Sequence, residues 1–276
     1  MKWIFVVVLR LSVVGIALAT IIAQYSSAFL ILRVLFRTKE AYKLQLKSLR
    51  ITSDKMKNIF KIGVPSALQY AIFAIANLFV QTSVNSFSHT IVEGNSAATN
   101  ADPLVYDMMA AFYTACTSFM GQNLGAKKKD RVIKSYLICM FYSFLIGLVL
   151  GCSLYIFRYE FLGLFTNDLV VVEAGIKRLS IMALSYSISA FMDCTIAASR
   201  GMGRSIGATI IVIWGSCVFR VVWIYTVFAH FRTIESLYLL YVFSWIITAV
   251  AEIIYFIWIY KKENKANEEP DVHLQY

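Results

Sequence analysis

Residues 119–132 read FMGQNLGAKKKDRV, a polar loop bracketed by glycines and followed by clustered lysines. A phosphate-binding loop requires the pattern G-x-x-x-x-G-K-[ST] between a strand and a helix. Here Gly121 and Gly125 stand too close together, Lys127 does not directly follow the second glycine, and a long apolar run replaces the strand. The stretch is therefore predicted to be a short basic turn where the chain leaves a membrane and re-enters it.

The composition also indicates a membrane protein. Of the 276 residues, 59% are hydrophobic and 15% are charged, whereas soluble domains average about 45–50% apolar and about 25% charged residues. Apolar runs near the ~20 residues that a spanning helix needs lie at 12–36, 59–88, 103–124, 132–157, 176–199, 205–229 and 237–260. Because the alternating pattern of barrel strands is absent, the predicted fold class is an all-α polytopic membrane protein with about seven transmembrane helices.

The positive charges indicate which connections face the cytosol. The net charge is +10, and most of the 26 Lys and Arg residues lie in every second connection between the apolar runs. The connection 86–103 contains neither Lys nor Arg. Since Lys and Arg accumulate in cytoplasmic loops, this alternation predicts a multi-pass protein of the plasma membrane with a cytosolic C-terminus. It also argues against nucleic acid as a partner, because the charge follows the topology of the chain.

No pattern for catalysis or metal binding occurs in the sequence. The five cysteines lie within apolar runs without a C-x-x-C pair, and the three histidines are dispersed. We therefore expect a protein that is not an enzyme, has no metal site and needs no cofactor.

The N-terminal part is predicted to hold one membrane helix and a linker. The helix lies within 1–36, and the basic segment 37–58 separates it from the other apolar runs. This segment is either a solvated cytosolic linker or a helix on the membrane surface, with Lys43, Lys47 and Arg50 facing anionic headgroups.

The rest of the chain is predicted to form a bundle and a tail. The bundle contains the six runs within 59–262, and the polar end 263–276 is expected to be a disordered cytosolic tail. Asp102 and Pro103 are predicted to begin a helix, with Asp102 as its cap and Pro103 in its first turn.

Ionisable side chains inside the apolar runs are candidates for function because their burial in a membrane is costly. Asp193 and Glu252 lie at similar distances from the cytosolic ends of their runs. They are candidates for ion coupling by sharing a proton or holding Na⁺; the alternative is an internal bond that only packs helices. For Arg220 we predict a structural ion pair with Asp107, which lies at a compatible depth; the alternative is a contact with the substrate.

Four amides predict either a cavity wall or contacts between helices. Gln69, Asn77, Gln81 and Asn85 recur at multiples of four along the run 59–88, on one side of a helix. Amides of this kind join membrane helices by hydrogen bonds, or they line a water-filled cavity that accepts many substrates.

The last apolar run carries aromatic candidates. Tyr241, Trp245 and Thr248 share a helical face with Glu252. Aromatic rings on such a face either pack against neighbouring helices or hold organic cations by cation–π contacts.

The order of several motifs resembles the multidrug and toxic compound extrusion (MATE) family. FMGQNLGAKKKDRV is similar to the segment after the second helix of that family's C-terminal lobe. The resemblance continues through KIGVPSALQ at 61–69, VNSFSHTIVEGNSAATN at 84–100, MDCTIAASRGMG at 192–203 and FRVVWIYTVF at 219–228. GIALATIIAQ at 15–24 resembles the start of the last helix of the N-terminal lobe.

The resemblance implies two six-helix lobes around a cavity that opens alternately to the two sides of the membrane. It also implies exchange of Na⁺ or H⁺ for organic, often cationic, compounds. On that plan the chain holds the six-helix C-terminal lobe preceded by one extra helix, and the rest of the N-terminal lobe is missing. We expect a partial chain of a secondary active efflux antiporter. The alternatives are a lipid-linked oligosaccharide flippase of the same superfamily and an inactive fragment that needs a separate N-terminal lobe.

Overall fold

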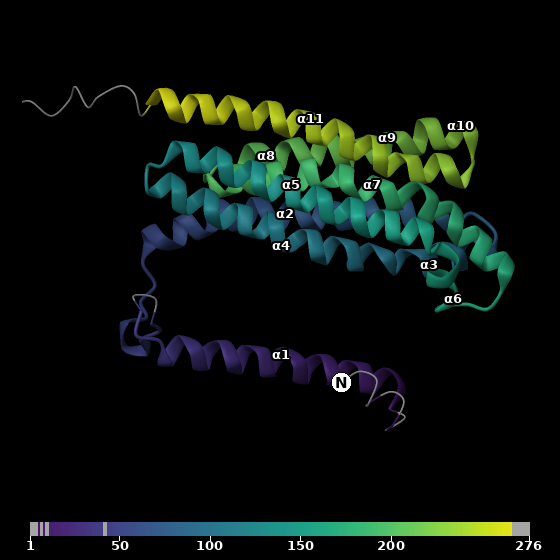
Figure 1. Ribbon diagram of the computed structural model, residues 1–276, viewed down its shortest axis with the longest axis horizontal. Coiled ribbons are helices and arrows are strands. Elements are labelled where there is room, and N and C mark those ends of the chain that lie inside the picture. The colour runs from purple at the N-terminus through teal and green to yellow at the C-terminus, as the bar shows by residue number, and fades with distance from the viewer. Residues whose placement is uncertain (1–4, 6–7, 9–10, 41–42, 267–276) are drawn as a thin grey trace, which may run out of the picture. The chain divides into compact units, whose positions relative to one another are not determined.

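Figure 1 shows a computed structural model of the protein, which describes residues 5, 8, 11–40 and 43–266. The described residues form helices and turns without any strand. The chain divides into two units, Met1–Lys57 and Asn58–Tyr276. The predicted all-α fold class is confirmed.

The first unit contains one long helix, α1 (Ser12–Arg37). Many of its apolar side chains are exposed, as expected for a helix that contacts lipid. After α1 the described residues form only one 3₁₀ turn, η2 (Leu46–Ser48), before the next helix begins at Ser53. In the described part of 38–52 the predicted surface helix is therefore not present, whereas residues 53–58 belong to α2.

The second unit is a helical bundle that includes most of α2. Its elements are α2 (Ser53–Val84), α3 (His89–Thr99), α4 (Ala101–Gly125), α5 (Lys129–Ile156), α6 (Arg158–Gly163), α7 (Leu169–Gly201), α8 (Ser205–Val212), η3 (Ile213–Val218), α9 (Phe219–Trp223), η4 (Ile224–Phe228), α10 (Ala229–Phe231) and α11 (Ile234–Ala266). The stretch from α8 to α10 is one continuous helix, in which η3 and η4 are π-helical segments.

Six helical stretches of the described chain are long and apolar enough to cross a membrane. They are Ala17–Arg37, Ser53–Val84, Lys129–Ile156, Leu169–Gly201, Ser205–Phe231 and Ile234–Lys262. The seventh predicted span, 103–124, is the 25-residue helix α4, which does not reach the hydropathy of the other six. This helix carries Asp102 and Asp107. The protein is a multi-pass membrane protein.

Helix α7 is the central helix of the bundle. In its most apolar window 72% of the residues are buried, against 39% or less in the other five candidate spans. Small residues allow neighbouring backbones to approach it closely, as is common in membrane bundles. A Cβ atom on Gly151 of α5 would lie 2.0 Å from the carbonyl oxygen of Ala183 in α7. The serine-rich composition of this run therefore reflects contact with other helices instead of lipid.

Most of the connection 86–103 is helical, because it contains α3. Two expectations about local structure need correction, namely the cap at Asp102 and the tail that begins at residue 263. Asp102 is not a cap: α4 begins at Ala101, and the Asp102 carboxylate bonds to side chains of α7. At the other end, α11 continues through residues 263–266 of the predicted tail. Residues 267–276 lie outside the described residues.

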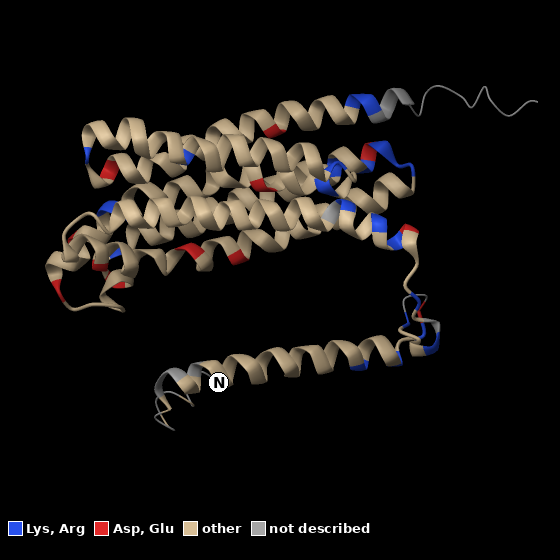
Figure 2. Ribbon diagram, turned by 180° about the vertical axis from the view of Figure 1, so that it is seen from behind, with Lys and Arg blue, Asp and Glu red and all other residues tan. Residues whose placement is uncertain are grey.

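The basic residues of the second unit gather mostly at one end of the bundle (Figure 2). This end contains the α4–α5 turn, the α7–α8 turn and the last turns of α11. Connections that are far apart in sequence thus place their positive charge together.

Candidate functional site

A cavity of about 850 Å³ lies inside the second unit. Its walls come from α2, α4, α7, α8, α9 and α11. Four charged residues line it: Asp102, Asp193, Arg200 and Arg220. Its volume lies in the range of pockets that hold small organic ligands, about 300–1,000 Å³.

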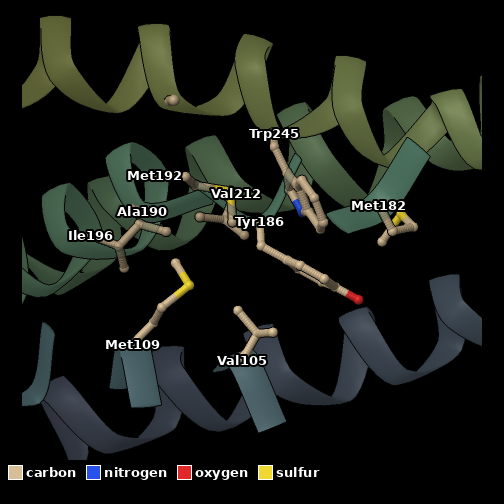
Figure 3. Packing of buried hydrophobic residues seen from close by; sticks show 10 residues of the cluster. Val105, Met109, Met182, Tyr186, Ala190, Met192, Ile196, Val212 and Trp245 are labelled. Atoms are coloured by element: carbon tan, nitrogen blue, oxygen red, sulfur yellow. The ribbon is translucent and has the colours of Figure 1, made fainter. Parts of the chain in front are cut away.

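Part of the lining belongs to the hydrophobic core (Figure 3). The residues common to the cavity wall and the core cluster are Met182, Met192, Ile196, Val212 and Trp245, together with Phe73, Tyr106, Tyr113 and Tyr241 at the edge of the cluster. Methionine and aromatic side chains offer an adaptable apolar surface. The cavity therefore combines a few charged side chains with an apolar wall that fits hydrophobic compounds.

The predicted amide stripe of α2 divides into two pairs. Gln69 and Asn77 line the cavity, whereas Gln81 and Asn85 are exposed, and Gln81 Nε2 donates to Asn85 Oδ1 at 2.9 Å. Positions four apart drift by about 40° per step around an α-helix. At the end of the stripe, Gln81 and Asn85 therefore point away from the cavity.

Gln69 binds two residues near the basic end of the bundle. Its Oε1 atom accepts a hydrogen bond from Arg200 at 2.6 Å and one from Thr209 at 3.3 Å. Arg200 also interacts electrostatically with the carboxylates of Asp193 and Glu252. In sequence Arg200 marks only the end of an apolar run, but in the structure it connects one wall of the cavity to both acidic candidates.

Asp193 and Glu252 have different surroundings. Asp193 lines the cavity, whereas Glu252 lies outside it, with no exposed surface and no hydrogen-bond partner for either carboxylate oxygen in the described part of the chain. The two carboxylates therefore form no direct pair. Their similar depth, counted along the sequence, says nothing about the direction in which each helix points its side chain.

The predicted pair of Arg220 with Asp107 is wrong. Arg220 is 2% exposed, and its Nη1 donates to Asn77 Oδ1 at 2.9 Å while its Nε donates to Ser244 Oγ at 3.4 Å. Asp107 lies on the wall of a separate, largely apolar pocket of about 560 Å³. Asp107 is five positions after Asp102, which rotates its carboxylate about 140° around α4, away from the cavity.

The bundle instead contains a pair between Arg178 and Asp102. Arg178 Nη2 lies 2.6 Å from Asp102 Oδ2, and Arg178 Nη1 donates to Asn95 Oδ1 at 3.2 Å. The Tyr186 hydroxyl donates to the other Asp102 oxygen. Arg178 lies near the start of the apolar run 176–199, and the structure buries it inside α7.

The aromatic candidates of α11 lie at the cavity, but the Tyr241 ring already contacts cationic groups of the protein. The Arg220 guanidinium lies 4.6 Å from the ring centroid, and that of Arg178 lies 5.8 Å from it. Trp245 lines the cavity and packs against Tyr106 and Tyr241. The described contacts therefore favour a packing role for Tyr241 over a site for an organic cation.

Thr248 contributes to helix packing outside the cavity. Its Oγ1 donates to the Ser244 carbonyl oxygen at 2.7 Å and lies 2.9 Å from Ser216 Oγ. This contact joins α11 to η3, beside Gly215. Among the described residues no cluster of three or more His, Cys, Asp or Glu forms a metal site.

Comparisons with known proteins agree with this architecture. The family model described as MatE matches residues 65–226, more than half of the chain. The chain is 23% identical over 214 residues to the probable multidrug resistance protein YoeA of Bacillus subtilis (strain 168). The aligned region covers 75% of this chain and 46% of that protein. It is 28% identical over 185 residues to the probable multidrug resistance protein NorM of Bacillus thuringiensis subsp. konkukian, with 65% and 40% covered.

A solved structure of a MOP superfamily transporter from Pyrococcus furiosus has the same fold. The TM-score is 0.85 at 22% sequence identity, over 95% of this chain and 59% of that chain. The chain thus spans less than half of the two relatives and about three fifths of this structure.

Proposed function

The chain belongs to the MatE family, and from this premise we propose that it is the C-terminal lobe of a secondary active efflux antiporter. Members of this family are membrane transporters and not enzymes. The proposed reaction is export of organic, often cationic, compounds across the plasma membrane in exchange for Na⁺ or H⁺. The names of the two relatives support multidrug export, and the gathered positive charge supports a cytosolic C-terminus.

The observation that carries this proposal is the cavity. Four charged side chains line one space inside a bundle of membrane helices, and such residues are expensive unless they serve a pathway or a pair. Apolar and aromatic side chains form much of the remaining wall. A wall of this kind suits a range of organic compounds, because hydrophobic contact requires no fixed pattern of hydrogen bonds.

For coupling we propose Asp193 in preference to Glu252. Asp193 lines the cavity, so a proton or Na⁺ bound there competes directly with a positively charged substrate. Glu252 is buried outside the cavity and interacts electrostatically with Arg200. A cation on Glu252 would influence the substrate only indirectly, through Arg200.

We expect Asp193→Asn to remove the competition between the coupling cation and an organic cation. Rhodamine 6G is a fluorescent organic cation whose binding to the purified chain in detergent can be titrated. Binding to the unmodified chain should weaken about fivefold or more when Na⁺ replaces choline or when the medium is acidified, which is the usual size of coupling between ligands. Binding to the Asp193→Asn variant should respond to neither change.

Asp107→Asn is the matched control, because it removes a carboxylate that lies outside the cavity. This variant should keep the response of the unmodified chain. If the response survives in Asp193→Asn and disappears in Glu252→Gln, the assignment of coupling to Asp193 is wrong.

We further propose that transport requires an N-terminal lobe, because the chain spans less than half of its relatives. A single bundle leaves polar cavity groups without the cover that a second lobe provides, and unsatisfied polar groups are costly in lipid. Cells that express this 276-residue chain alone should extrude rhodamine 6G no faster than cells with an empty vector. Efflux by the chain alone would contradict this requirement.

A further inference from the structure

Arg220 is a buried cation for which the described protein supplies no anion. The residue is 2% exposed, and its hydrogen-bond acceptors are a neutral amide and a neutral hydroxyl, from Asn77 and Ser244. Its guanidinium also lies 5.0 Å from the centroid of the Phe73 ring. In the part of the chain that the structure describes, no Asp or Glu forms an ion pair with it.

Arg178 provides an internal comparison within the same bundle. It is 4% exposed, and Asp102 neutralises it at 2.6 Å. Among the described residues a carboxylate therefore pairs with Arg178, and none pairs with Arg220. Arg178 does not line the cavity, whereas Arg220 does. The arginine that pairs with no Asp or Glu of the described residues is thus the one on the cavity wall.

Arg220 faces a cavity that also presents a carboxylate at a similar depth. Asn77, the partner of Arg220, is eight residues from Gln69, about 12 Å along α2. Asp193 is seven residues from Arg200, about 10 Å along α7. Arg200 bonds to Gln69, so the distance to Asn77 along α2 and the distance to Asp193 along α7 are both counted from this contact. Both run away from the basic end of the bundle.

Asp193 and Arg220 nevertheless do not neutralise each other. No ion pair joins them among the described residues, and Tyr106 interacts electrostatically with both. The cavity wall therefore presents separate negative and positive groups with an aromatic residue near both. A ligand that carries both charges on an aromatic body would match this arrangement.

We propose that Arg220 binds an anionic group of the substrate, so that the cavity takes aromatic compounds bearing a carboxylate or similar anion. A guanidinium holds a carboxylate with charge-assisted hydrogen bonds, which are stronger in a site of low dielectric. In a zwitterionic compound the cationic group would lie toward Asp193. The inference rests on the proposed transport function and specifies the charge of its substrates.

Two dyes that differ in a single group test the inference. Rhodamine 19 is the free carboxylic acid of rhodamine 6G, which is its ethyl ester, so only the first carries an anionic group beside the cationic ring system. We expect the unmodified chain in detergent to bind rhodamine 19 about tenfold more tightly than rhodamine 6G, the ratio for one charge-assisted hydrogen bond. In Arg220→Gln this preference should disappear while rhodamine 6G binding is retained.

The comparison on the unmodified chain decides the matter even where a variant does not fold. Equal or weaker binding of rhodamine 19 overturns the assignment of an anion site but leaves the proposed transport function intact, provided that rhodamine 6G binds. Binding of neither dye contradicts both. Fluorescein, which has a related ring system and no cationic group, then separates simple anions from zwitterions as ligands.

Arg131→Gln serves as the matched variant, because Arg131 is exposed and does not line the cavity. It removes the same positive charge outside the proposed anion site. We expect this variant to keep the preference for rhodamine 19. Loss of the preference in Arg131→Gln but not in Arg220→Gln would overturn the assignment to Arg220.

Discussion

Arg178→Gln should lower the free energy of unfolding by about 3–5 kcal/mol, the usual cost of removing one partner from a buried ion pair. The substitution leaves the Asp102 carboxylate without its cation and the Asn95 oxygen without its donor. The Tyr186 hydroxyl would remain as a partner of Asp102, and it cannot balance a negative charge inside the bundle. Unfolding of the purified chain in mixed micelles with increasing SDS, followed by circular dichroism, measures the loss.

The neighbouring residue provides the control. Lys177 Nζ lies 3.2 Å from Glu235 Oε1, and about half of each side chain is exposed. Exposed pairs of this kind contribute at most about 1 kcal/mol, so Lys177→Gln should unfold almost as the unmodified chain does. If both variants lose the same free energy of unfolding, burial does not make the Arg178–Asp102 pair more stabilising than the exposed pair.

A second variant separates the pair from its surroundings. Removing both charges in Arg178→Gln with Asp102→Asn should cost less than the sum of the two single substitutions, because no unpaired charge remains buried. Additive losses would contradict a direct interaction between the two side chains. The same titration with SDS gives all three values.

Gly151→Ala is expected to lower stability by about 3 kcal/mol, through overpacking between α5 and α7. The added Cβ would lie 2.0 Å from the carbonyl oxygen of Ala183 and 2.9 Å from its carbonyl carbon. Both atoms belong to the backbone of the central helix and cannot rotate aside. The two helices would have to separate, which would disturb the packing on both sides of α7.

Gly63→Ala is the control with the same chemical change. A Cβ atom on Gly63 in α2 meets nothing within 4 Å, and alanine favours a helix more than glycine does. This variant should be as stable as the unmodified chain or slightly more stable. The yield of monodisperse protein after heating in detergent, measured by size-exclusion chromatography, compares both variants. Equal yields for both would contradict the close contact at Gly151.

The cavity shows how far sequence reasoning reaches for a membrane protein. Periodicity identified one side of α2, and the structure places Gln69 and Asn77 of that side on the cavity wall. Gln81 belongs to the same stripe but has turned away from the cavity, because positions four apart do not repeat on a helix with 3.6 residues per turn. A spacing of four residues therefore identifies residues on the same side of a helix only over about two turns.

Partner choice among the charged residues could not be predicted. The depth of a residue in the membrane can be counted along its helix. By this count Asp107 lies at a depth compatible with Arg220, which is why it was predicted as the partner. The rotation of each helix about its own axis decides which side chains meet, and that rotation depends on packing over the whole bundle. For the same reason Asp102, which was expected to cap a helix, binds Arg178 on a helix 76 positions further along the chain.

The sequence by itself determined that this protein is a helical membrane protein with alternating basic connections, and its ordered motifs indicated the family that the MatE match confirms. These properties are local, because hydropathy and loop charge act on each segment separately. Only the tertiary structure decided that Arg178 has a carboxylate partner, while Arg220 lies on the cavity wall and pairs with no Asp or Glu of the residues that the structure describes. That difference arises from side chains on separate helices, whose meeting depends on how the helices pack.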